Sequence, residues 1–312
     1  MTPRRIASLL AGSTEILYGL GLGDHVVAVS HECDYPEEAR LKPRLTFTNI
    51  DAAASSAEID RAVRTESAAG APLYRIDAER LAELRPDLIV TQAQCDVCAV
   101  SLDDVRAAVE SVPGLASAAV VALNPNTLDG IFDDIARVGR AAGVPDRAER
   151  YIASLRARVD NIRLRAADIA RVDPWRVVCL EWTEPIMVAA NWMPELIRIA
   201  GGRCDITDAG AKTVYTDWND VVEFDPQVVI VAPCGFELSR SVAELGNLKR
   251  LLEWDQIDAV QHHRLYAADG NAYFNRSGPR IVDSLELLAG LIHADRFSDL
   301  AERYAHAWRK LA

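Results

Sequence analysis

Short apolar runs rich in β-branched residues alternate along the chain with patterns typical of helices, and this alternation constrains the fold most. It is the pattern of βαβ units, in which helices join parallel strands. The predicted strands are Ile6 to Leu10, Val26 to Ser30, Leu88 to Gln92, Ala118 to Leu123, Arg176 to Glu181, Val228 to Ala232 and Leu265 to Ala268. The sequence therefore predicts an α/β protein with mostly parallel sheets.

A single long helical pattern covers residues 146–172, with apolar residues spaced for one helix face. Asp146 and Glu149 have the spacing of a capping box, and Pro174 ends the pattern. At 1.5 Å per residue, about 26 residues form a rod of roughly 40 Å. We expect this rod to bridge the two halves of the chain.

A weak internal repeat flanks this helix. LAELRPDLIVTQAQC (residues 81–95) and VVEFDPQVVIVAPC (residues 221–234) share a helix end, a proline, an apolar strand and then a cysteine. We therefore expect two Rossmann-like lobes with parallel sheets, 1–145 and 173–312, bridged by one long rigid helix at 146–172, with a cleft between the lobes. The alternative is a doubly wound enzyme with a long internal helix.

Charge and hydropathy narrow the range of partners. The 312 residues carry a net charge of −12, and the basic residues are scattered, which disfavours nucleic acid and anionic lipid. No apolar run approaches the roughly 18 residues that span a bilayer, so membrane insertion is not expected. Ser13, Thr14 and Glu15 interrupt the first apolar stretch, which we interpret as a strand and helix. The expected location is the cytoplasm, or the periplasm or extracellular space if a leader is missing from this chain.

Ligands of parallel α/β sheets bind beyond the carboxyl ends of the strands, so residues that follow predicted strands are candidates for binding. Several of these candidates are aromatic and offer flat surface to a ring-shaped ligand. For each aromatic residue the alternative is core packing, and for the two hydroxyl residues it is helix capping. The ligand-binding candidates are Ser13, Thr14, Tyr35, Gln92, Trp182, Trp192, Trp218, Asn271, Tyr273 and Phe274.

Four of the six cysteines also follow predicted strand ends, and His31 lies near the first of them. Four thiolates are the number that zinc or an iron–sulfur cluster requires. The alternatives are small packed thiols, or a thiol enzyme with His31 as the base. The metal-ligand candidates are Cys33, Cys95, Cys98, Cys234 and His31.

Motifs of common enzyme classes do not occur in the sequence. It contains no Ser-centred elbow, no Walker loop and no Gly-x-Gly-x-x-Gly, and HEC at residues 31–33 lacks the second histidine of a zinc protease. We therefore expect a protein that is not an enzyme.

Several stretches together resemble the cobalamin and iron-siderophore class of ABC-transporter substrate-binding proteins, the vitamin B12-binding-protein-like group with a helical backbone. The resemblance covers essentially the whole chain and implies a class III periplasmic-binding-protein-like fold. It also implies a corrinoid or another small metal chelate as ligand and an ABC permease as partner. The matching stretches are RIASLLAGSTEILYGLGLGD, HECDYP, LRPDLIVTQAQCDVCAVS, NWMPELIRIAGG and DGNAYFNRSGPRIVDSLELLA.

The resemblance assigns roles to single residues. Tyr35, Trp218 and the Tyr273–Phe274 region match ligand-facing positions, while Glu79 and, in the second lobe, Glu195 match positions that dock on the permease. Where cobalamin-binding relatives have a tryptophan after the third strand, this chain has Gln92 and then the cysteine pair. The leading hypothesis is a protein that holds a corrinoid (cobalamin-like) or related metal-containing cofactor in the cleft. The alternative is a cytoplasmic metalloprotein with an iron–sulfur cluster or zinc on the cleft cysteines.

Overall fold

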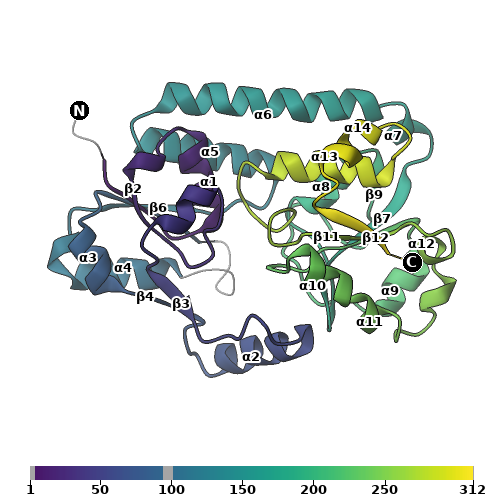
Figure 1. Ribbon diagram of the computed structural model, residues 1–312, viewed down its shortest axis with the longest axis horizontal. Coiled ribbons are helices and arrows are strands. Elements are labelled where there is room, and N and C mark those ends of the chain that lie inside the picture. Colours follow the sequence, from purple (N-terminus) through teal and green to yellow (C-terminus); the bar gives the residue numbers. More distant parts are fainter. Residues whose placement is uncertain (1–3, 94–100, 312) are drawn as a thin grey trace. The chain divides into compact units, whose positions relative to one another are not determined.

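The computed structural model describes residues 4–93 and 101–311, and the chain divides into two compact units (Figure 1). Unit 1 is formed by Met1–Pro125, Asp129–Ser154 and Ser277–Pro279. Unit 2 is formed by Asn126–Leu128, Leu155–Arg276 and Arg280–Ala312. The domain boundaries expected at residues 145 and 173 stay a prediction. Within the described residues, no helix is both long enough and apolar enough to cross a membrane.

Unit 1 is built on a parallel sheet with the strand order β2-β1-β5-β6. Its interior strand β5 is buried along its whole length, because helices cover both faces of a parallel sheet. Strands β3 and β4 form a separate antiparallel pair, and helix α2 lies between them in the sequence. Ser55 and Glu58 form a capping box at the start of α2. The strands are β1 (Ile6–Ser8), β2 (Val26–Val29), β3 (Thr46–Thr48), β4 (Tyr74–Ile76), β5 (Leu88–Gln92) and β6 (Ala119–Leu123). The helices are α1 (Ala11–Gly19), α2 (Ser56–Ala68), α3 (Ala78–Leu84), α4 (Leu102–Ser111) and α5 (Leu128–Ala141).

Unit 2 is built on a mixed sheet with the order β12-β11-β10-β7-β8, and β9 pairs with β7. The three central strands are parallel, and antiparallel strands lie on both sides of them. The strands are β7 (Trp175–Thr183), β8 (Ile186–Val188), β9 (Gly202–Arg203), β10 (Val228–Val231), β11 (Leu265–Ala268) and β12 (Trp308–Leu311). The helices are α7 (Ile169–Val172), α8 (Met193–Ile199), α9 (Trp218–Phe224), α10 (Leu238–Ala243), α11 (Leu245–Leu248), α12 (Asp258–Gln261), α13 (Ile281–Ile292) and α14 (Ser298–Arg303).

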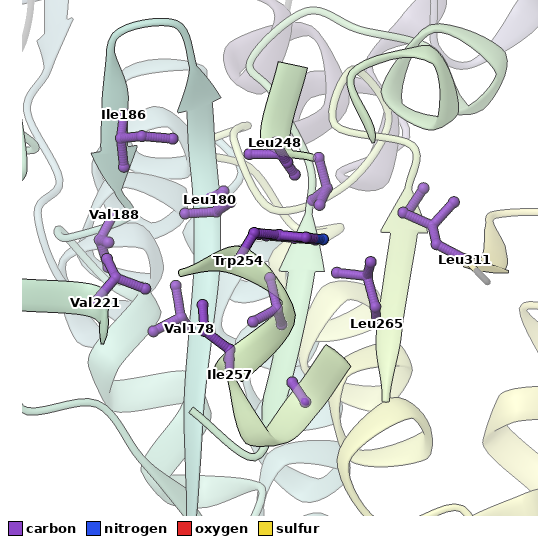
Figure 2. Packing of buried hydrophobic residues seen from close by; sticks show 14 residues of the cluster. Val178, Leu180, Ile186, Val188, Val221, Leu248, Trp254, Ile257, Leu265 and Leu311 are labelled. Atoms are coloured by element: carbon purple, nitrogen blue, oxygen red, sulfur yellow. The ribbon is translucent and has the colours of Figure 1, made fainter. Parts of the chain in front are cut away.

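A large apolar cluster of unit 2 lies on one face of this sheet. Figure 2 shows the indole of Trp254 in the middle of the cluster, with Leu180, Leu248 and Leu265 around it. These side chains come from strands and from the helices that cover them, and each is almost completely buried. Burial of their apolar surface stabilises the packing of the helices on the sheet.

The internal repeat has the same local structure in both units. Helices α3 and α9 each have seven residues and an aspartate N-cap, Asp77 or Asp217, whose carboxylate accepts a backbone N–H. Each helix ends at a left-handed residue, Arg85 or Asp225, which is followed by proline and a buried strand. The expected α/β class with parallel sheets is confirmed.

The long helix is shorter than expected and starts one residue earlier. Helix α6 runs over Pro145–Ala166, with proline at its first position, and the short helix α7 follows after a turn. In that turn the carboxylate of Asp168 pairs with the guanidinium of Arg296, with N–O distances of 2.8 and 3.0 Å. The helix is interrupted at this turn, where the ion pair forms between residues far apart in the sequence. The apolar periodicity of residues 146–172 gives no sign of the interruption.

Candidate functional site

The segments after β7, β10 and β11 meet at the carboxyl edge of the unit 2 sheet. The backbone N–H of Cys234 donates to the carbonyl of Glu181 over 3.1 Å, which ties the segment after β10 to β7. The N–H of Asn271 donates to the carbonyl of Phe236 over 3.0 Å, which ties the segment after β11 to the same place. The side chains of three distant stretches are thus fixed next to one another, as expected for parallel strands.

Gly270 allows the closest of these approaches. A Cβ atom at this position would lie 2.1 Å from the carbonyl oxygen of Pro233, which no larger residue can tolerate. The side-chain amide of Asn275 then donates to the carbonyls of Ala232 and Gly270, each over 2.9 Å. The loop after β11 is therefore held tightly against the loop after β10.

Aromatic side chains line part of this edge. The rings of Trp182 and Phe236 meet edge to face with their centroids 5.1 Å apart. The guanidinium of Arg240 lies 3.6 Å from the centroid of the Phe236 ring. The buried Phe236 ring therefore contacts both the indole of Trp182 and the cation of Arg240. Cys234 is exposed at the same edge.

Arg276 adds a positive charge that the sequence analysis did not single out. Its Nε and Nη2 atoms donate to the backbone carbonyl and side-chain oxygen of Asn271, over 2.5 and 2.7 Å. Two hydrogen bonds to one residue fix the plane of the guanidinium. Arg276 stands in the stretch DGNAYFNRSGPR, in which Asn271, Tyr273 and Phe274 are the predicted ligand-binding residues.

Three predicted aromatics of unit 2 are largely buried. The indole N–H of Trp192 donates to the carbonyl of Phe274 over 2.7 Å, and both rings are at most 5% exposed. Phe274 has a left-handed φ of +66°, and its N–H donates to the hydroxyl of Ser284. Tyr273 is 9% exposed, and its hydroxyl lies 3.2 Å from Nε2 of His306. These residues support the loop from inside.

Trp218 also packs against protein. Its ring stacks on Trp254 with a centroid distance of 5.9 Å, and its N–H donates to the carbonyl of Leu252 over 2.8 Å. The half-buried indole belongs to the rim of the unit 2 core.

We expect Trp218→Ala to lower the free energy of unfolding by about 2 kcal/mol, because half-buried aromatic contacts are lost. Trp218→Phe keeps most of the stacking on Trp254 and is expected to cost about half as much. Urea denaturation measures both values. Unchanged stability together with weaker ligand binding would instead place the indole on the ligand side.

The predicted hydroxyl residues of unit 1 form a buried network under the carboxyl edge of its sheet. The hydroxyl of Ser8 lies 2.6 Å from that of Ser13 and 2.8 Å from that of Thr14. Thr14 donates to the sulfur of Cys33 over 3.0 Å, and all four side chains are fully buried. Cys33 is thus an interior thiol that accepts a hydrogen bond.

His31 and Tyr35 occupy the edge itself. Nδ1 of His31 lies 2.7 Å from the hydroxyl of Thr46, which also accepts the backbone N–H of His31 over 3.0 Å. Burial, with the nearby Arg44 guanidinium, lowers the pKa of the imidazole. Tyr35 is 47% exposed, and Gln92 is buried at the end of β5.

A multi-cysteine metal centre receives no support. Cys95 and Cys98 lie outside the described residues, and in residues 4–93 and 101–311 no group of three or more His, Cys, Asp or Glu side chains is arranged to hold a metal ion. Cys179 is fully buried within β7, and burial raises the pKa of its thiol.

The two predicted docking acids differ in their surroundings. Glu79 is exposed in the first turn of α3. Glu195 accepts the backbone N–H of Leu128 over 3.1 Å, at the first residue of α5, so it has an internal partner. Docking of either residue on a permease stays a prediction.

Comparison with known proteins identifies relatives over almost the whole chain. The family model of the periplasmic binding proteins matches residues 6–272. An uncharacterized ABC transporter substrate-binding lipoprotein of Bacillus subtilis is 23% identical over 303 residues, which cover 95% of this chain and 82% of the relative. The vitamin B12-binding protein of Vibrio cholerae is 25% identical over 285 residues, covering 90% and 86%. That of Yersinia pestis is 26% identical over 280 residues, covering 89% and 82%.

Solved structures share the fold. The periplasmic vitamin B12-binding protein of Vibrio cholerae superposes with a TM-score of 0.66 at 23% identity, covering 94% of this chain and 98% of that one. The heme-binding protein of Roseiflexus sp. RS-1 in its apo form gives 0.66 at 23% identity, covering 96% and 99%. The expected class III fold is therefore confirmed.

These comparisons decide several expectations. The resemblance to substrate-binding proteins is confirmed, and so is the expectation that the protein is not an enzyme, because the family consists of binding proteins. The expected cytoplasmic location and the iron–sulfur or zinc alternative find no support among the relatives. The chain belongs to the periplasmic binding protein family.

Proposed function

We propose that this protein is the substrate-binding component of an ABC importer and that its ligand is cobalamin or a closely related corrinoid. Relatives that are 25–26% identical over about nine-tenths of the chain include the vitamin B12-binding proteins of Vibrio cholerae and Yersinia pestis. The heme-binding structures are less than 25% identical and support the fold alone. Corrinoid therefore has the stronger support among metal chelates.

The observation that carries the proposal is the carboxyl edge of unit 2. The half-buried Trp182, backed by the buried ring of Phe236, supplies apolar surface, and Asn271 holds the Arg276 guanidinium in the loop after β11 at the same edge. Cobalamin combines a large ring system and amide side chains with a phosphate in its nucleotide loop. Aromatic surface suits the ring, and a fixed guanidinium suits the amide oxygens or the phosphate.

The importer assigns the protein a partner and a place of action. We propose that it works outside the cytoplasmic membrane and delivers its ligand to a permease. Glu79, exposed on α3, is available for contact with basic residues of that permease. Glu195 serves the internal hydrogen bond to Leu128 and is the weaker docking candidate.

Titration with cyanocobalamin tests the proposal. We expect saturable 1:1 binding by isothermal titration calorimetry, with quenching of tryptophan fluorescence from Trp182 at the edge. Hemin and a ferric hydroxamate siderophore, titrated in the same way, are expected to bind more weakly. Absence of saturable binding for cyanocobalamin would overturn the corrinoid proposal, and tight binding of hemin alone would reassign the ligand to heme.

A further inference from the structure

Phe274 has an unusual backbone conformation in the loop after β11. Its φ of +66° lies in the left-handed region, which a bulky residue other than glycine rarely adopts. The N–H of Asn275 donates to the carbonyl of Tyr273 over 2.7 Å, so the chain turns back on itself within three residues around Phe274. A turn of this kind with a positive φ is strained, and such strain persists only where the surrounding contacts impose it.

Two side chains from other elements impose this conformation. The N–H of Phe274 donates to the hydroxyl of Ser284, on α13, over 2.8 Å. The carbonyl of Phe274 accepts the indole N–H of Trp192, the residue before α8, over 2.7 Å. Both backbone polar groups of Phe274 are therefore fixed by side chains, and all three residues belong to unit 2.

The two side chains that hold Phe274 offer almost no surface to a ligand. Ser284 is 1% exposed and Trp192 is 5% exposed. The hydroxyl of Ser284 also donates to the carbonyl of Arg280 over 3.1 Å, which directs its lone pairs away from α13 and orients them for the N–H of Phe274. Any effect of these side chains on ligand binding must therefore be exerted through the loop.

The residues after Phe274 connect this clamp to the charged group of the candidate site. The side-chain amide of Asn275 donates to the carbonyls of Ala232 and Gly270, each over 2.9 Å. Arg276 follows directly, and its guanidinium donates twice to Asn271. Three successive residues are thus held by hydrogen bonds, so a change of φ at the first would displace the guanidinium at the third.

We propose that Ser284 and Trp192 are positioning residues for ligand binding. They hold Phe274 in its left-handed conformation and thereby place the Arg276 guanidinium before the ligand arrives. Without either bond, relaxation at Phe274 leaves only a fraction of the molecules with Arg276 in place, and the affinity falls by that fraction. The inference rests on the proposed function, and it gives Trp192 an indirect role where the sequence predicted a ligand contact.

Isothermal titration calorimetry with cyanocobalamin tests the two residues. Ser284→Ala and Trp192→Phe each remove one hydrogen bond to Phe274. We expect each variant to bind about fivefold more weakly, which corresponds to a loop in place in about one-fifth of the molecules. Trp308→Phe is the matched control, because it loses an indole N–H bond to the carbonyl of Ala301, of 3.0 Å, outside the loop. The control should keep the wild-type affinity.

Double variants with Arg276→Ala separate positioning from general destabilisation. Once the guanidinium is absent, Ser284 and Trp192 have no charged group to position. Ser284→Ala and Trp192→Phe should then change the affinity by less than about twofold. An equal loss in the presence and absence of Arg276 would show that the two residues act independently of it, and would overturn the inference.

Amide hydrogen exchange on the unaltered protein gives a test that does not depend on a variant that folds. We expect peptides covering residues 269–276 to be protected in the free protein as strongly as in the cyanocobalamin complex. Rapid exchange in the free protein, with protection only after binding, would show that the ligand orders the loop and would overturn the inference.

The outcomes distinguish this inference from the proposed function. Wild-type protein that binds cyanocobalamin, with unchanged affinity in Ser284→Ala and Trp192→Phe, overturns the positioning role and leaves the function intact. If the wild-type protein does not bind cyanocobalamin, both proposals fail.

Discussion

Arg158→Met is expected to lower the free energy of unfolding by about 3–5 kcal/mol, because it leaves a buried carboxylate without its main partner. Nε and Nη2 of Arg158 each donate to the carboxylate of Glu286 over 2.9 Å, and Nη2 also pairs with Asp283. The hydroxyl of Tyr304 donates to Glu286 over 2.7 Å. The side chain of Glu286 is only 5% exposed, so water cannot replace the lost guanidinium.

Urea denaturation of the whole chain measures this effect. Arg163→Met, on the same helix α6, is the matched control, because Arg163 pairs with Asp160 on the exposed surface. The control is expected to cost at most about 0.5 kcal/mol. Arg303 lies 3.3 Å from Glu286 and can neutralise part of its charge when Arg158 is removed. The loss of stability in Arg158→Met is therefore expected nearer about 3 than about 5 kcal/mol. Equal losses in the two variants would contradict the assigned role of the buried pair.

The same network makes a prediction about pH. Hydrogen bonds from Arg158 and Tyr304 lower the pKa of Glu286 below its ordinary value of 4.5, although burial opposes them. A depressed pKa means that the stabilisation is present above about pH 4.5 and is lost as the pH falls through the folded-state value. The difference in stability between wild type and Arg158→Met should therefore narrow on acidification.

The strands that the sequence predicted are those that pair in parallel within the two sheets. All seven are present with small shifts at their ends, because strands of parallel sheets form continuous apolar runs, even where, as in the edge strand β6, they are only half-buried. The missed strands β3, β4, β8, β9 and β12 have two to four residues. In β12 the sequence Trp308-Arg309-Lys310-Leu311 has no apolar run, and antiparallel pairing with β11 defines the strand. Such pairing depends on tertiary structure and leaves little trace in the sequence.

For the site, the sequence predicted positions along the chain better than side-chain directions. Cys33 follows β2 as expected, yet its sulfur points to the interior, where Thr14 donates to it. Trp192 follows β8 and turns inward, because its indole N–H reaches the carbonyl of Phe274. Arg276 was missed because it lies eight residues beyond β11 and is brought to the edge by Asn271. Strand ends can be found from local patterns, whereas these directions depend on distant partners.

Arg276→Ala is expected to weaken cyanocobalamin binding about 10- to 100-fold, which corresponds to about 1.5–3 kcal/mol for a charged hydrogen-bonding group. The guanidinium is fixed by Asn271 at the edge that carries Trp182, so it is ordered before the ligand arrives. Preorganisation lowers the entropic cost of binding, and therefore its loss should appear in affinity. Asn271→Ala keeps the charge but removes one of the two hydrogen bonds, and a smaller loss is expected.

Isothermal titration calorimetry measures the affinities, and Arg250→Ala serves as the matched control. Arg250 belongs to the same unit and is 68% exposed, and its nearest acid is Glu184 at 3.7 Å. Removing it changes the net charge as Arg276→Ala does, so a general electrostatic effect would weaken binding equally in both variants. Equal weakening would contradict a specific contact at Arg276. A loss confined to Arg276→Ala, with an unchanged urea midpoint, would place the guanidinium against the ligand, because a purely structural role would lower stability as well.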